Sequence, residues 1–186
     1  MKALKIAGII VLAIVVILGV IIAIQPAEGH VEKSTVINAP PPVVFAQLNS
    51  FKTFTKWAAW AKMDPEAKYS YEGPESGVGT KMNWDGRKIG RGSQWIVESE
   101  ENKRVKSGLS FEGFDGTSYA EFNLAPEGSG TKVTWSYTGQ NSGIKGKAIW
   151  VMMQPALATQ YEQGLSDLKS MIESMPPAPA DTMKVK

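Results

Sequence analysis

The sequence lacks residue types on which many functional sites depend. It has no cysteine and a single histidine, His30, among its 186 residues. Disulfide bridges, thiolate metal sites, cysteine nucleophiles and metal sites with several histidines are therefore excluded. We predict that the protein binds no metal ion and no cofactor.

The chain also lacks a strong excess of either charge. Its 20 lysine and arginine residues face 18 acidic residues, for a formal net charge of +2. Two of the bases, Lys2 and Lys5, precede a long apolar run, so the remainder of the chain is close to neutral. Binding to nucleic acid depends on clustered lysine and arginine that neutralise phosphates. We therefore expect no nucleic-acid partner.

Charged side chains are absent from residues 6–24. As a helix with a rise of about 1.5 Å per residue, this run measures about 28 Å, close to the hydrocarbon thickness of about 30 Å. A cleaved signal peptide has a shorter apolar core, of about 7–15 residues, and ends in a small-residue cleavage site. The segment Ala-Ile-Gln-Pro at 23–26 matches such a site poorly. The run therefore predicts a retained transmembrane anchor.

The charges that flank this run predict its orientation. Lys2 and Lys5 lie on the N-terminal side, whereas Glu28 and Glu32 with a single Lys33 lie on the other side. Basic flanks stay in the cytoplasm. We expect a single-pass protein of the inner cell membrane, with residues 1–5 in the cytoplasm and the domain in the periplasm.

Hydrophobic spacing divides the rest of the chain into predicted elements. Residues 25–30 form a short linker, and alternating apolar and polar residues over 31–38 predict a strand. Three prolines at 40–42 end this strand and suit the start of a helix. We expect that helix over 43–48 and a second one over 51–62, where aromatic residues recur at threefold spacing.

The pattern changes twice more towards the C-terminus. Between 68 and 138, six alternating segments are separated by turn residues, which predicts six strands in a consecutive antiparallel meander. Helical spacing returns over 144–175, with a break or kink at Pro155 because proline removes a helix hydrogen bond. Residues 176–186 are expected to form a disordered tail.

This order of elements is that of the helix-grip fold, an α+β fold in which a curved antiparallel sheet surrounds a long C-terminal helix. The sequence resembles the SRPBCC (START-like) superfamily, more narrowly its polyketide cyclase/dehydrase-like branch, as a bacterial membrane-anchored member. The domain is expected over 31–175. The resemblance rests on these segments in this order: 39–48 (APPPVVFAQL), Phe51, Trp57 with Trp60, 77–79 (GVG), 84–86 (WDG) and 130–135 (GTKVTW).

The resemblance implies a hydrophobic cavity between the sheet and the long helix. Candidate lining residues come from the predicted strands and from the last helix; they are Trp84, Trp95, Phe111, Phe122, Trp135, Tyr137, Met152, Tyr161 and Leu165. Trp57 and Trp60 are candidates for the cavity mouth. Plain core packing explains the same aromatic residues, and both alternatives remain open at this stage.

Three functions fit these observations. The first is a membrane-anchored module that binds or transports a hydrophobic small molecule or lipid. The second is a polyketide cyclase/dehydrase-like enzyme that acts on an apolar substrate, although no nucleophile and base stand in a recognisable arrangement, and we name no catalytic residue. The third is an envelope module that binds another protein, whose identity the sequence does not indicate.

Overall fold

The computed structural model of this chain describes residues 2–114 and 116–176, so the expected tail from residue 177 onwards lies outside the described residues. The elements in chain order are α1 (Lys2–Ala23), β1 (Glu28–Ile37), α2 (Pro41–Leu48), α3 (Phe51–Trp57), α4 (Ala59–Met63), β2 (Lys68–Glu72), β3 (Lys81–Gly86), β4 (Gly90–Glu100), β5 (Arg104–Phe111), β6 (Ser118–Glu127), β7 (Gly130–Gln140) and α5 (Gly143–Glu173).

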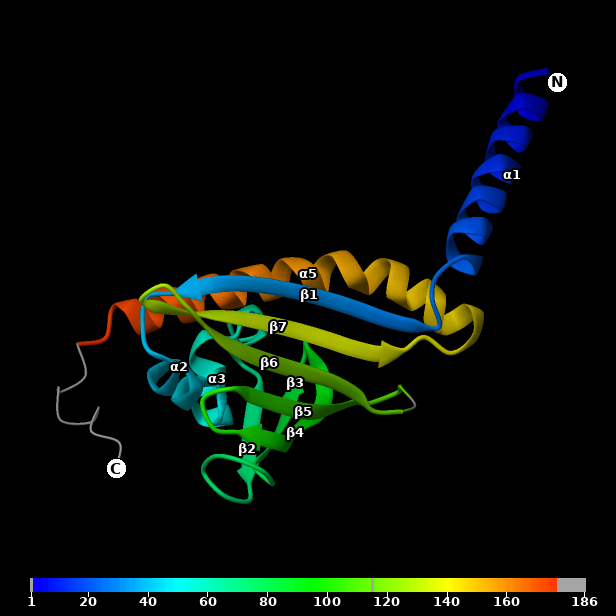
Figure 1. Cartoon of the computed structure of the whole chain (residues 1–186). Helices are drawn as coiled ribbons and strands as arrows, with labels where there is room; N and C mark the ends of the chain where they lie inside the picture. Colours follow the sequence, from blue (N-terminus) through cyan, green and yellow to red (C-terminus); the bar gives the residue numbers. More distant parts are fainter. Residues whose placement is uncertain (1, 115, 177–186) are drawn as a thin grey trace.

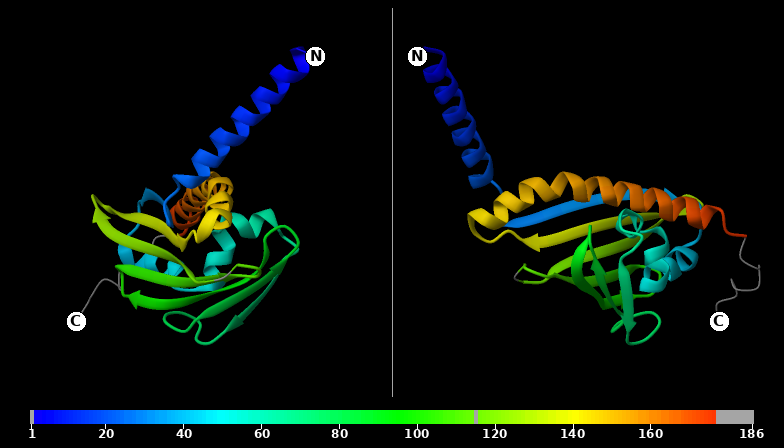
Figure 2. Two further views of the ribbon diagram at one scale, coloured as in Figure 1. Left: turned by 90° about the vertical axis from the view of Figure 1, so that its right-hand side faces the viewer. Right: turned by 180° about the vertical axis from the view of Figure 1, so that it is seen from behind.

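The strands form one antiparallel sheet of seven strands in the order β1-β7-β6-β5-β4-β3-β2. The consecutive meander expected for β2 to β7 is confirmed. Strand β1 forms the edge of the sheet and pairs with β7 along its whole length. The sheet curves around α5, with the short helices beside it (Figure 1 and Figure 2). The predicted α+β helix-grip fold is therefore confirmed.

The second short helix differs from the prediction. The helix expected over 51–62 is interrupted at Ala58, where a backbone ψ of 129° leaves the helical range. The chain therefore forms two helices, α3 and α4, that differ in direction. Ala58 is fully buried, so only a small side chain fits at this corner. The turn directs Trp60 and Met63 of α4 towards α5.

The long helix α5 continues through Pro155, so the predicted break at this residue is wrong. Proline removes the hydrogen bond to the carbonyl of Val151, but Pro155 is exposed, so water can reach that carbonyl. The two halves of α5 pack differently. Tyr161, Leu165 and two further apolar residues are buried in the C-terminal half, whereas Trp150 is the buried side chain of the N-terminal half.

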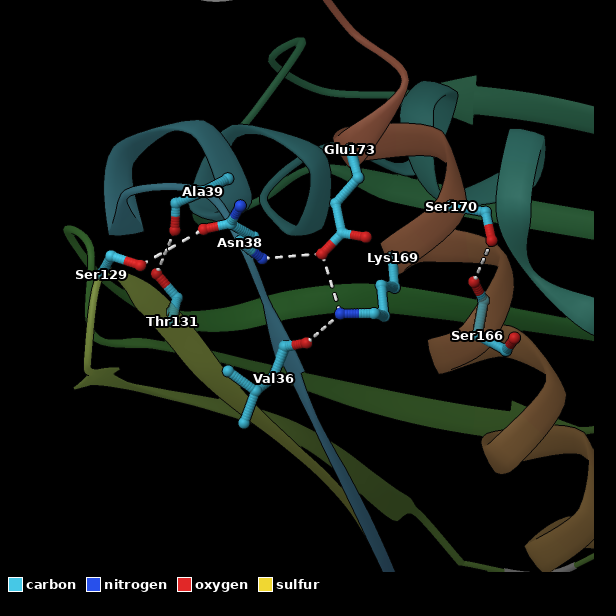
Figure 3. A network of polar contacts seen from close by, with 9 residues as sticks. All are labelled: Val36, Asn38, Ala39, Ser129, Thr131, Ser166, Lys169, Ser170 and Glu173. Atoms are coloured by element: carbon cyan, nitrogen blue, oxygen red, sulfur yellow. Dashed lines mark hydrogen bonds and ion pairs between the residues drawn. The ribbon is translucent and has the colours of Figure 1, made fainter.

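A polar network fixes the C-terminal half of α5 to the end of β1 (Figure 3). The backbone N–H of Asn38 donates to Glu173 at 2.8 Å, and the ammonium of Lys169 donates to the carbonyl of Val36 at 2.6 Å. Lys169 also contacts Glu173 at 2.8 Å, and these two donors lower the pKa of the Glu173 carboxyl. The members of this network that belong to α5 all lie in its C-terminal half.

Gly164 explains how closely α5 approaches the sheet. A Cβ at this position would lie 2.9 Å from the indole ring of Trp135, which is stacked on Tyr161 at 3.8 Å and has little room to move. We expect Gly164→Ala to lower the free energy of unfolding, because overpacking costs about 1–3 kcal/mol. Because Trp135 has little room to move, we expect a cost in the upper part of this range, above the gain of about 1 kcal/mol in helix propensity.

Urea denaturation followed by tryptophan fluorescence measures this effect. Ser166→Ala, on an exposed part of the same helix, serves as the matched control and should change stability by less than about 0.5 kcal/mol. A gain in stability in Gly164→Ala would show that α5 is not held against Trp135.

Helix α1 leaves the domain at the end where α5 begins (Figure 1). It has 22 residues and is long and apolar enough to span a membrane. Strand β1 starts at Glu28, so the expected linker over 25–30 is too long, and residues 24–27 are all that separates α1 from β1. Lys147 of α5 donates to the carbonyl of Ala23 at 3.0 Å, which holds the first turns of α5 beside the end of α1.

Candidate functional site

An apolar pocket of about 220 Å³ lies between α4, the strands β3 and β5, the turn between β3 and β4, and α5 on both sides of Pro155. Only Lys88 and Gln160 contribute polar side chains to its described lining. The residues around it are Trp60, Met63, Trp84, Lys88, Ile89, Leu109, Phe111, Met153, Ala156, Leu157 and Gln160. We call this space the apolar pocket.

A buried carboxylate shapes one wall of the apolar pocket. Asp64 follows α4 directly and is 3% exposed. One of its carboxylate oxygens accepts hydrogen bonds from the backbone N–H groups of Lys88, at 2.7 Å, and Ile89, at 3.4 Å. The turn between β3 and β4 is therefore held against the end of α4. This arrangement brings Lys88 and Ile89 into the pocket wall.

Helix α4 forms another wall of the apolar pocket and is held in place by two contacts. Trp60 packs edge-on against Phe54 with the ring centres 5.3 Å apart. The ammonium of Lys62 pairs with the carboxylate of Asp167 on α5 at 2.7 Å. The first contact holds α4 against α3 and the second holds it beside α5, so the indole of Trp60 and the side chain of Met63 stay at the pocket.

A second, smaller pocket of about 130 Å³ lies nearer the start of α5. It shares Phe111 and Met153 with the apolar pocket, so these two side chains stand between the two spaces. Its described lining is more polar, since it includes Ser118, Tyr137, Gln140 and Asn141. We call this space the polar pocket; its other lining residues are Phe114, Gly116, Gly146, Ile149 and Trp150.

The comparisons with known proteins agree with this architecture. A family model described as "Polyketide cyclase / dehydrase and lipid transport" matches residues 28–173, which include the whole sheet and α5. The chain belongs to this family. A comparison with curated proteins found no significant match.

Solved structures support the fold of this polyketide cyclase/dehydrase family member. Protein MLL2253 from Mesorhizobium loti has a TM-score of 0.61 at 16% identity, over 80% of this chain and 99% of that chain. Protein CV1439 from Chromobacterium violaceum has a TM-score of 0.59 at 16% identity, over 78% and 99%. CalU16 from Micromonospora echinospora has a TM-score of 0.55 at 18% identity, over 81% of each chain. At these identities the likeness shows the fold alone.

Three residues predicted to line the cavity of this family member, and one predicted for its mouth, line the two pockets. Trp84 and Trp60 line the apolar pocket, and Tyr137 lines the polar pocket. Phe111 borders both. The sheet and the helices therefore bring these four aromatic side chains, which are far apart in the sequence, to two adjacent pockets.

Five other predicted residues lie in a packed core. Trp135 stacks on Tyr161 at 3.8 Å and on Phe122 at 4.9 Å. Trp57 meets Trp135 edge-on at 5.5 Å, and Leu165 belongs to the same cluster. Trp57 is only 1% exposed, so the prediction that it forms the cavity mouth is wrong. The described lining of either pocket includes none of the five.

Trp95 and Met152 were predicted to line the cavity and do not. Trp95 lies on the outer face of the sheet, because Gln94 and Ile96 face inwards. Its indole covers Gly108 on β5, where a Cβ would lie 2.7 Å from the ring. Met152 is 81% exposed on the outer face of α5.

The sequence prediction missed several pocket residues on α5. Trp150, Met153 and Leu157 face the sheet side, at spacings of three and four residues that continue to Tyr161. This spacing extends the stripe of the C-terminal half backwards by three turns. Following it from Tyr161 would have identified Met153 instead of Met152.

Proposed function

We propose that this domain binds a hydrophobic small molecule or lipid in the apolar pocket and exchanges it with a membrane. The observation that supports the proposal is a pocket with almost wholly apolar walls beneath the N-terminal half of α5, in which Trp150 is the buried side chain. The family description, which includes lipid transport, supports the same function. Burial of apolar ligand surface would drive the binding, at about 25 cal/mol per Å².

The size of the pocket restricts the ligand. Small-molecule sites usually measure about 300–1,000 Å³, which exceeds the 220 Å³ of the apolar pocket. A small ring system or part of a single lipid chain fits this space without rearrangement. Met63 and Met153 line it and have flexible, polarisable side chains, which adapt to ligands of different shape.

The proposal includes membrane anchoring by α1. Residues 24–27 separate α1 from β1, and four residues reach at most about 14 Å when fully extended. The contact between Lys147 and Ala23 shortens this reach further. A spanning α1 would therefore hold the start of α5, and with it the polar pocket, next to the lipid headgroups.

The predicted orientation is tested by fusing a reporter enzyme after Lys186. We expect activity from a reporter that functions only outside the cytoplasm, because Lys2 and Lys5 keep the N-terminus inside. Replacing both lysines with glutamate should reduce this activity. Activity from a reporter restricted to the cytoplasm would contradict the orientation.

Ligand binding is tested by calorimetric titration of the full chain, held in phosphatidylcholine nanodiscs, with 2-ethylnaphthalene. We expect saturable binding with one site per chain and a negative heat-capacity change, the robust sign of apolar burial. Affinity should change little with salt concentration, since screening acts on charges. Heats equal to those of empty nanodiscs would contradict the proposed function.

A further inference from the structure

The polar pocket contains side chains that can form hydrogen bonds, which a purely apolar ligand cannot accept or donate. The hydroxyl of Tyr137 on β7 donates to the Oγ of Ser118 on β6 at 2.8 Å. Gln140 and Asn141 add amide groups to the same lining. Among the described residues that line this pocket, none carries a charge.

The position of Gly139 makes room for this hydroxyl pair. A Cβ at Gly139 would lie 2.5 Å from the Tyr137 hydroxyl oxygen and 2.9 Å from the Ser118 oxygen. The backbone is therefore open where the two hydroxyls meet. Any larger residue at 139 would displace Tyr137 from this position.

The hydrogen-bonding capacity of the pair is only partly used. The Tyr137 hydroxyl donates its hydrogen bond to Ser118. The Ser118 hydroxyl can therefore still donate to a ligand, and the Tyr137 oxygen can still accept from one. Burial raises the pKa of Tyr137, so the phenol remains neutral near pH 7. An uncharged oxygen group on a ligand matches these groups, whereas a carboxylate would lose hydration without gaining a cation.

We propose that the polar pocket binds the uncharged, oxygen-bearing group of an amphiphile, such as a hydroxyl, ketone or ester, while the apolar pocket holds its hydrocarbon part. This inference rests on the proposed function. Phe111 and Met153 stand between the two pockets, and rotation of the flexible Met153 side chain joins them.

The position of the polar pocket suits a ligand taken from a bilayer. The backbone N–H of Asn141, a lining residue, donates to the carbonyl of Ala27 at 2.7 Å, and its side-chain amide donates to the carbonyl of Pro26 at 3.4 Å. These two hydrogen bonds hold the polar pocket beside the segment that follows α1. The polar group of the ligand would lie towards the headgroups, with the hydrocarbon part directed into the domain.

Three probes with one ring system test the inference on the full chain in phosphatidylcholine nanodiscs. They are 2-ethylnaphthalene, 2-naphthaleneethanol and 2-naphthaleneacetate, titrated by calorimetry with empty nanodiscs as the blank. We expect the alcohol to bind about three- to tenfold more tightly than the hydrocarbon, as for one net hydrogen bond. The carboxylate should bind more weakly than the alcohol at neutral pH.

Tyr137→Phe and Ser118→Ala should each bring the ratio of alcohol to hydrocarbon affinity close to one. The ratio does not depend on the fraction of folded protein, so partial unfolding of a variant cannot imitate this result. Thr138→Val removes a hydroxyl from the neighbouring position, which contacts His30 outside the pocket, and should keep the wild-type ratio. Equal binding of alcohol and hydrocarbon by the wild type, or an unchanged ratio in both pocket variants, would overturn the inference.

The same titrations separate this inference from the proposed function. If all three probes bind equally well, the domain binds apolar ligands and the polar site is wrong. If the carboxylate binds as tightly as the alcohol, the selection for uncharged groups is wrong. If none of the probes binds, the proposed function itself is wrong.

Discussion

Ala156→Trp is expected to weaken the binding of 2-ethylnaphthalene at least tenfold. Ala156 lines the apolar pocket from α5 and is itself exposed, so an indole at this position enters the pocket without disturbing the core. Each CH₂ group that the ligand can no longer bury costs about 0.8 kcal/mol, so the exclusion of two such groups already exceeds a factor of ten. Calorimetric titration in nanodiscs measures the loss.

A matched variant separates blocking of the pocket from a general effect of tryptophan on α5. Gln154 is two residues away, is exposed and belongs to neither pocket lining. Gln154→Trp should bind the probe with wild-type affinity. Both variants should unfold at the same urea concentration as the wild type. Wild-type affinity in Ala156→Trp would show that the ligand binds elsewhere.

Leu168→Ala is expected to lower the free energy of unfolding by about 2–5 kcal/mol, the usual range for a large buried residue replaced by alanine. Leu168 is 0% exposed on the half of α5 that packs onto the sheet. Leu168 belongs to the same buried core cluster as Trp135 and Tyr161. Because these aromatic rings are stacked on one another, they collapse poorly into a cavity, which favours the upper part of the range.

Urea denaturation of the full chain in nanodiscs, followed by tryptophan fluorescence, measures this change. Met152→Ala is the matched control on the same helix, since Met152 is 81% exposed and its loss should cost less than about 0.5 kcal/mol. If Leu168→Ala and Leu165→Ala both left stability unchanged, α5 would not be the helix that the sheet grips.

Periodicity predicted β6, β7 and the C-terminal half of α5 because one face of each is buried. The alternation along β6 and β7 and the stripe from Tyr161 to Ile172 both arise because one face is buried and the other is exposed to solvent. The prolines indicated the start of α2, although the helix begins at Pro41, two residues before the expected start, with prolines in its first turn. The fold was therefore predictable from the sequence.

Periodicity failed where two faces are partly covered. In β4 the sheet register shifts between Ile96 and Glu98, and Trp95 fills space on the outer face that Gly108 leaves empty. Such a partner on another strand is not visible in a local pattern. The N-terminal half of α5 is partly exposed on several sides, so its apolar residues, such as Ile144 and Met152, do not mark the buried face.

The site was harder to predict than the fold for a related reason. An aromatic residue that lines a pocket and one that fills a core have the same period in a strand. Phe111 and Phe122 lie on adjacent strands; Phe111 borders the two pockets, and Phe122 stacks on Trp135. Whether an aromatic residue lines a pocket or fills the core depends on how closely α5 packs over it. That packing involves contacts between distant parts of the chain, which a local sequence pattern does not contain.

Native mass spectrometry of the full chain, released from nanodiscs made directly from cell membranes, tests the central claim most directly. We predict that the wild type carries one bound apolar molecule per chain, that its extracted form contains an uncharged oxygen group, and that Ala156→Trp is recovered without it. Recovery of the wild type and Ala156→Trp in the same ligand-free form would contradict the account.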